Sequence, residues 1–154
     1  MSNVTQRILI GFAFAGLLGI FVVGVLTGAA VTGWRAALRA GNEAATLQDV
    51  KTIAAVEIQY YNNHNRTFGS FDQMITERML TSKFAGSPPI ADGYVFHLSI
   101  VPKAPSLRTC YTLNADPQSG ATGMNHFYID SRDSMIHVNP DEPASATDPL
   151  LGSE

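Results

Sequence analysis

Hydrophobic residues run without interruption near the start of the chain. Residues 8–31 read ILIGFAFAGLLGIFVVGVLTGAAV and hold no charged residue. As a helix this segment would rise about 36 Å, which is enough to cross a hydrocarbon core of roughly 30 Å. Trp34, Arg35 and Arg39 follow it and are residue types typical of the headgroup region. The pattern predicts a transmembrane helix over residues 8–31.

A cleaved secretory signal is the alternative for this segment. Arg7 would then be its basic region, and Gly28-Ala29-Ala30 offers small residues for cleavage. The apolar run is longer than the roughly 7 to 15 residues usual in signals, which favours a retained anchor. The basic residues at its two ends are too similar in number to fix the orientation.

Two pairs of small residues, each four positions apart, lie within the predicted span. They are Ala15, Gly19, Gly24 and Gly28. This spacing allows two helix backbones to approach closely and predicts helix packing in the membrane. The alternative is that glycine and alanine are simply common in membrane helices.

Further along, apolar residues return at steps of three and four. The set is Leu47, Val50, Ala54, Ile58 and Tyr61. Such spacing predicts an amphipathic helix with one buried face, and Glu57 is among the charged residues expected off that face. No proline interrupts residues 1–87, so we expect one long helix that ends at the turn formers of residues 62–65.

The rest of the chain predicts a short helix and a sheet. Ser70 and Gln73 have the spacing of a capping box, so we expect a helix from there to about Leu80. Alternating residues predict strands over residues 94–101, 109–115, 125–130 and 135–139. Pairing Ile129 with Ile136 would make a hairpin with its apolar side chains inward. The fold class is therefore α+β, with a long N-terminal helix on a small antiparallel sheet.

These patterns divide the chain into four parts. The divisions are an N-terminal flank (1–7), the transmembrane helix (8–31), a head (32–139) and an acidic, proline-rich tail predicted to be disordered (140–154).

Composition excludes several functions. The 154 residues carry a net charge of -3, which gives no basic surface for nucleic acid. The single cysteine excludes zinc sites built on CxxC pairs. No G-x-S-x-G sequence frames a serine nucleophile. We therefore expect a protein that is not an enzyme.

Two groups of residues are candidates for a metal site, and apart from a zinc or calcium ion bound there we expect no cofactor. His97, His126 and His137 fall on the predicted outer face of the sheet, where imidazoles would suit zinc. Asp130 and Asp133 flank the hairpin loop, where oxygen ligands would suit calcium. Ordinary surface polarity and turn propensity explain both groups more simply.

The order of motifs resembles type IV pilin-like proteins, chiefly the pseudopilins of type II secretion and the minor pilins. The resemblance covers roughly residues 8–138. Its motifs after the apolar helix are Asn42-Glu43-Ala44-Ala45, Tyr60-Tyr61, Phe68-Gly69-Ser70-Phe71, Asp92-Gly93-Tyr94-Val95-Phe96, Ala115-Asp116-Pro117, Thr122-Gly123 and Phe127-Tyr128-Ile129-Asp130.

This resemblance implies a pilin-like fold and a non-enzymatic subunit of a type IV pilus or a type II secretion-like system. It implies a single pass through a bacterial inner membrane, with the C-terminal head in the periplasm or outside the cell. The partners would be the membrane, proteins of the assembly and other copies of the chain. Glu43, at the start of the soluble helix, is the expected interaction residue.

The N-terminus departs from the family pattern. Prepilins carry a basic leader ending in glycine and a glutamate at the fifth mature position. Here Ile8-Leu9-Ile10 precede Gly11-Phe12, and no glutamate occurs before Glu43. A pilin-like head on a permanent anchor fits this sequence better than a processed major pilin.

Two other functions remain open from the sequence. One is a membrane-anchored module that binds a ligand or a metal through a pilin-like head. The other is a soluble domain secreted after signal cleavage.

Overall fold

The computed structural model describes the backbone of residues 3–102, 104 and 107–153, and the side chains within these ranges from residue 30 onward. The chain forms two compact units, residues 1–37 and 38–154. Helix α1 (Asn3–Asn63) supplies all of the described first unit and the start of the second. The other elements are α2 (Phe71–Thr76), a 3-10 helix (Ser82–Phe84), β1 (Ile90–Ala91), β2 (Tyr94–Val101), β3 (Cys110–Pro117), β4 (His126–Asp130) and β5 (His137–Asn139).

The predicted membrane span lies outside the described side chains except for its last two residues, Ala30 and Val31. Its backbone is helical throughout, as part of α1. Within the part of the chain whose side chains are described, no helix is both long and apolar enough to cross a membrane. The prediction of a span over residues 8–31 therefore stays a prediction.

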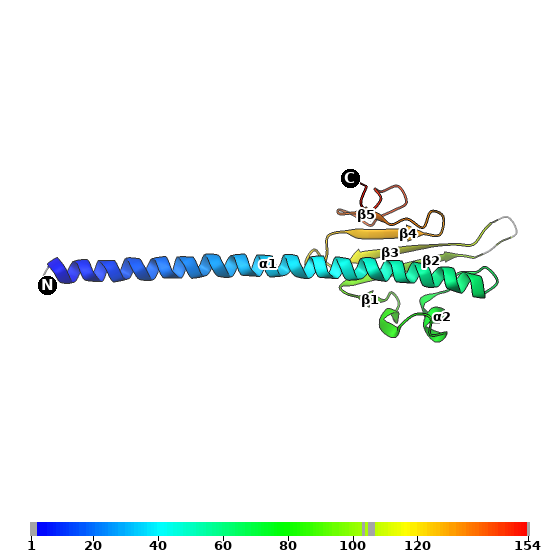
Figure 1. Cartoon of the computed structure of the whole chain (residues 1–154), viewed down its shortest axis with the longest axis horizontal. Helices are drawn as coiled ribbons and strands as arrows, with labels where there is room; N and C mark the ends of the chain where they lie inside the picture. The colour runs from blue at the N-terminus through cyan, green and yellow to red at the C-terminus, as the bar shows by residue number, and fades with distance from the viewer. Residues whose placement is uncertain (1–2, 103, 105–106, 154) are drawn as a thin grey trace. The chain divides into compact units, whose positions relative to one another are not determined.

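The second unit contains a five-stranded antiparallel sheet whose strand order follows the chain order, β1-β2-β3-β4-β5 (Figure 1). Asp92 and Gly93 join β1 to β2 with φ angles of 50° and 77°. A two-residue turn with two positive φ angles suits the twist of a hairpin, and this explains the Asp-Gly pair. The pairing of Phe127 with Val138 confirms the inward hairpin register that was predicted from the sequence.

The last part of α1 packs on the inner face of this sheet through one buried stripe. Its members are Thr46, Val50, Ile53, Glu57 and Tyr60, each at most 5% exposed. They follow steps of four and three, which keep residues on one face of a helix. The predicted stripe was wrong in part, because Ile58 is 49% exposed while Glu57 is fully buried.

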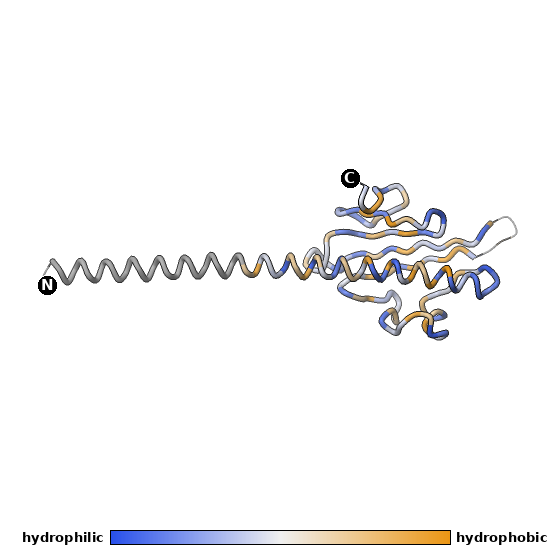
Figure 2. Tube along the Cα trace, in the orientation of Figure 1, coloured by the Kyte–Doolittle hydropathy of each residue, from blue (hydrophilic) through white to orange (hydrophobic). Residues whose placement is uncertain are grey.

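The core lies between α1 and the inner face of the sheet. Tyr94, Phe96, Tyr111, Leu113 and Phe127 point into it from three strands, and each is at most 3% exposed. Inward residues alternate with polar ones along the strands (Figure 2), as expected for a sheet with one covered face.

Two local predictions are confirmed. Helix α1 ends at Asn63, and Asn65 and Arg66 after it adopt positive φ angles of 51° and 61°. The capping box is also present, since the Ser70 hydroxyl accepts from the Gln73 N–H and the Gln73 side chain accepts from the Ser70 N–H. Helix α2 ends at Thr76, four residues earlier than predicted.

The C-terminal segment 140–153 is folded, and the prediction of a disordered tail is wrong for these residues. The Val138 N–H donates to the Pro149 carbonyl, and the Leu151 N–H donates to the Ile136 carbonyl. Ala144 is only 3% exposed, and its carbonyl accepts a 2.7 Å hydrogen bond from Asn114. Backbone and amide hydrogen bonds hold this segment in place. Such bonds leave no hydrophobic pattern in the sequence, which is why the fold of the segment was not predicted.

Candidate functional site

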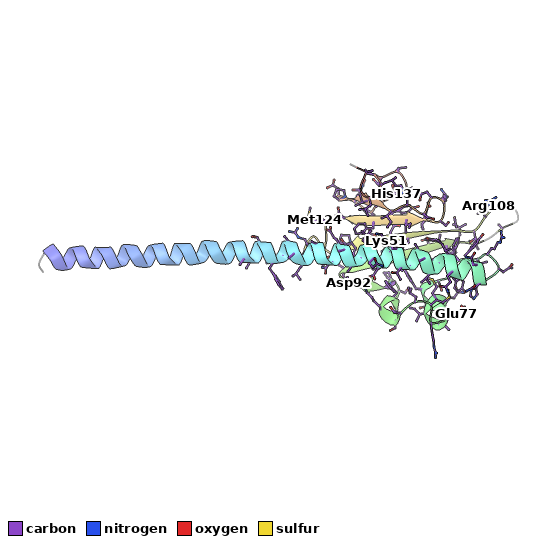
Figure 3. The ribbon with its side chains drawn as sticks, viewed as in Figure 1. Lys51, Glu77, Asp92, Arg108, Met124 and His137 are labelled. Atoms are coloured by element: carbon purple, nitrogen blue, oxygen red, sulfur yellow. The ribbon has the colours of Figure 1, made fainter. Side chains whose placement is uncertain are left out.

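Glu43 of α1 holds the loop between β3 and β4 against the helix. Its carboxylate accepts 2.8 Å hydrogen bonds from the Met124 N–H and from the Asn125 side-chain amide. Next to it, the Asn42 amide donates to the Thr122 carbonyl at 2.9 Å. Met124 lies at the end of the sheet opposite Arg108 (Figure 3). The residue predicted to bind a partner is thus engaged within its own chain, and we name this contact the Glu43 clasp.

Tyr94 of β2 also holds the loop between β3 and β4. The ring is fully buried, and its hydroxyl donates to the Asn125 carbonyl at 3.0 Å. A Cβ atom on Gly123 would collide with this hydroxyl and would lie 2.6 Å from the Tyr94 Cζ atom. Residue 123 must therefore be glycine for the ring and the loop to pack as they do.

A Glu43→Ala variant is expected to lose about 1 to 2 kcal/mol of stability, because two donors lose a charged acceptor. Urea unfolding at pH 7 measures this loss, and hydrogen exchange should speed up at the Met124 and Asn125 amides. Glu142→Ala is the matched control, since Glu142 is an exposed acid of the same unit. Equal stability of the two variants would contradict a structural role for the clasp.

Glu57 is a buried carboxyl group at the end of the α1 stripe. Its Oε2 atom accepts a 3.0 Å hydrogen bond from the Gly69 N–H, whereas Oε1 has no partner in the described part of the chain. A Cβ atom on Gly69 would lie 2.9 Å from the Tyr60 ring. Glycine at this position therefore lets the loop after α1 reach the carboxyl group.

Burial raises the pKa of Glu57 from its ordinary 4.5 to about 7, and the Gly69 N–H offsets part of this rise. Desolvation disfavours the charged form of a carboxyl group, which is why the pKa moves upward. The Tyr111 hydroxyl is also buried without a partner among the described residues. Burial, followed by the nearby Glu57 charge, raises the pKa of Tyr111. The protein thus holds a carboxyl group whose pKa is close to neutral pH near a tyrosine hydroxyl that stays protonated.

The three candidate histidines share one face of the sheet without forming one site. The strand register places His97, Asn114, Tyr128 and His137 in one row across β2 to β5 on the outer face. Three strand spacings of about 4.8 Å separate His97 from His137, whereas zinc–nitrogen bonds are about 2.0 Å long. These two histidines therefore cannot hold the same ion.

His126 and His137 each contact aspartate residues of the same chain. His126 Nδ1 lies 2.6 Å from Asp116 Oδ1. His137 is buried, with Nδ1 2.7 Å from the Asp148 carbonyl and Nε2 3.2 Å from Asp133 Oδ2. The Asp148 carbonyl, then Asp133, raises the pKa of His137. Through its contact with the Asp148 carbonyl, His137 thus ties the C-terminal segment to β5.

The two candidate aspartates close the hairpin loop. Asp130 Oδ1 accepts from the Arg132 N–H at 2.7 Å, and its Oδ2 accepts from the Tyr128 hydroxyl at 3.0 Å. Asp133 accepts from the Met135 N–H at 2.9 Å. Across the described residues, no three His, Cys, Asp or Glu side chains gather closely enough to hold a metal ion. The aspartates serve the turn itself.

Four predicted residues fall outside the described side chains. They are the helix-packing candidates Ala15, Gly19, Gly24 and Gly28. Nearby, Val31 and Trp34 are described, and they are 45% and 67% exposed.

The apolar pattern of the sequence does not reveal that Glu57 is buried. A stripe drawn through apolar side chains alone leaves this acid on the solvent-facing side of the helix. The signal was present, since Glu57 lies four residues after Ile53 and seven after Val50, both fully buried. Extending the stripe by spacing instead of by hydrophobicity would have found it.

Comparison with known proteins gives no relative. No family model matches the chain, and neither a curated protein nor a solved structure shows significant similarity to it.

Proposed function

We propose that this protein is a membrane-anchored, pilin- or pseudopilin-like subunit of a type IV pilus or a type II secretion-like system. Its role would be structural, through contacts with other subunits, and would involve no reaction. The bilayer would be a bacterial inner membrane, with the head in the periplasm or outside the cell. The observation that carries the proposal is α1, a single 61-residue helix that joins an uncharged apolar segment to a sheet-packing stripe.

The division of labour along α1 supports this function. The stripe from Thr46 to Tyr60 packs within the head, because all its members are buried against the sheet. The charge-free residues 8–31 belong to the other compact unit. A helix of this kind suits a subunit that uses its first part for lipid and for neighbouring helices.

The polar sites of the head support a structural role too. Glu43, Asp130 and His137 all point to partners within the chain and hold loops or the C-terminal segment in place. Side chains arranged in this way stabilise a head and leave its surface for contacts. For this reason we do not propose the metal-binding alternative.

The test uses membranes from cells that make the full-length chain with Cys110→Ser and Trp34→Cys, so that one cysteine reports on neighbouring helices. We expect the protein to stay in the membrane after a carbonate wash and to form disulfide-linked dimers on oxidation. Adding Gly24→Leu and Gly28→Leu should leave it in the membrane but reduce the dimer at least about five-fold, because bulky residues separate the helices.

Three outcomes would count against the proposal. Release of the protein by carbonate would exclude a membrane anchor, and a mass lacking the residues through about Ala30 would identify a secreted domain. Unchanged cross-linking in the double leucine variant would remove the glycine face as the contact between subunits. Thr27→Leu is the matched control, because it adds the same side chain one residue before Gly28.

A further inference from the structure

Strand β2 has one edge that is paired only at its start. Strand β1 contains two residues and pairs Ile90 with Val95 and Ala91 with Tyr94. One further hydrogen bond runs from the Phe96 N–H to the Pro89 carbonyl. Pro89 has no N–H to return to the Phe96 carbonyl, and the chain continues through Pro88. Two prolines therefore end the pairing where β2 still has five residues to run.

The direction of the remaining backbone groups follows from this hydrogen bond. In an antiparallel ladder, the N–H and C=O groups of alternate residues point to the same side. Because the Phe96 N–H points toward β1, the N–H and C=O groups of Leu98 and Ile100 point toward the same open edge. Within residues 3–102, 104 and 107–153, no hydrogen bond is made to these groups from that side.

A groove runs along this edge. It has a volume of about 380 Å³ and lies between the edge of β2, the start of α2 and the loop before β1. Its lining comprises residues 70–72, 86–89 and 96–100. Buried polar backbone groups need partners, and an exposed strand edge is a template for pairing with another chain. The groove gives this edge walls that a plain sheet edge lacks.

We propose that the open edge of β2 binds an extended peptide segment of a partner protein as an added strand. The backbone of the peptide would pair with Leu98 and Ile100 in place of the missing part of β1. Residues Phe96 to Ile100 span about 13 Å at roughly 3.3 Å per residue, so the edge accepts a segment of about five residues.

The lining also specifies the side chains of the occupant. Peptide residues on the inner side of the sheet would meet the partly exposed Leu98 and Ile100 side chains, and those on the outer side would meet the exposed His97 and Ser99. An alternation of apolar and polar residues fits these two sides. The exposed Asp72 lies on the wall. Residues 38–154 hold 13 acidic against eight Lys and Arg residues, which favours a cationic peptide.

The walls favour a single segment over a second folded copy of the chain. Strands pair about 4.8 Å apart, and the start of α2 and the loop at 86–89 already stand beside the edge at this point. A second sheet would have to bring its own covering elements into the same space.

The test uses the full-length protein in detergent and a synthetic eight-residue peptide of alternating valine and threonine with lysine at each end. We expect a Kd of about 100 μM and slower hydrogen exchange at the Leu98 and Ile100 amides. The same peptide with methyl groups on its six central backbone nitrogens should bind at least ten-fold more weakly, because it cannot donate to the edge.

A pair of variants isolates the edge. Leu98→Pro removes an outward N–H that the β2–β3 ladder does not use, and proline is tolerated in edge strands. Leu98→Ala removes the same side chain and keeps the N–H. We expect Leu98→Ala to bind the peptide within about three-fold of the unmodified protein, and Leu98→Pro to bind at least ten-fold more weakly, with similar melting temperatures.

Three results would overturn the proposal. They are no binding at about 1 mM peptide, equal binding of the methylated peptide, and equal binding by the two Leu98 variants. A dimer of the unmodified protein that Leu98→Pro dissociates, without peptide binding, would instead assign the edge to a second copy. Should Leu98→Pro fail to fold, the methylated peptide decides the question with the unmodified protein.

Discussion

A Glu57→Gln variant is expected to gain about 3 kcal/mol of stability over the unmodified protein as the pH rises from 4 to 8. The folded-state pKa of Glu57 is about 7, against 4.5 for the exposed group. Because the folded-state pKa is raised, protonation of Glu57 stabilises the folded protein. This stabilisation is fully present below pH 4.5 and is lost as the pH rises through about 7. The gap between the two values corresponds to about 3 kcal/mol. Glutamine keeps an acceptor for the Gly69 N–H and has no charge to desolvate.

Thermal unfolding of both proteins at several pH values measures this difference. At pH 8 the melting temperature of the variant should exceed that of the unmodified protein by about 10 °C. At pH 4 the two should melt within a few degrees of each other. His137 also titrates with a raised pKa, but it is present in both proteins and cancels in the comparison. A difference that does not depend on pH would contradict the buried, ionisable state of Glu57.

A Gly123→Ala variant is expected to lose about 3 kcal/mol of stability. Its new methyl group would collide with the hydroxyl group of Tyr94, a ring that is fully buried and cannot move into open space. Overpacking a rigid site typically costs about 1 to 3 kcal/mol, and here the displaced hydroxyl also loses its hydrogen bond to the Asn125 carbonyl. The Glu43 clasp on the same loop should loosen with it.

Gly120→Ala provides the control in the same loop. A Cβ atom at residue 120 would have no heavy atom within 4 Å, so this variant should unfold at the same urea concentration as the unmodified protein. Urea titrations of the three proteins give the comparison. If Gly123→Ala were as stable as Gly120→Ala, the loop would have to pack differently from the arrangement described here.

The strands were predictable from the sequence because their signal is local. Alternation placed β2 at residues 94–101 and gave the β4–β5 register correctly, since the side chains that alternate are the ones that set the pairing. Strand β1 was missed because two residues, Ile90 and Ala91, are too short for any period to appear. Its consequence, the open edge of β2, could not be foreseen without it.

The polar contacts were not predictable, because each joins residues that are far apart in the chain. Glu43 meets Asn125 across 82 positions, and Asn114 meets the Ala144 carbonyl across 30. No pattern within a short window of sequence marks such pairs. Alternation did place the three histidines on the outer face, but their distances depend on the strand order. The sequence therefore indicated which face they occupy and not whether they meet.

The chain-order sheet also bears on how the head folds. Every strand pairs with its neighbour in the chain, so the sheet can form from local hairpins, and proteins rich in local contacts fold fast. Helix α1 comes first in the chain, but its stripe can be buried only after β2 to β4 have formed. Until then Glu57 stays in water and ionised at neutral pH, so docking of α1 on the sheet should coincide with uptake of a proton. A folding rate that rises as the pH falls below 7 would be kinetic evidence for this proton uptake.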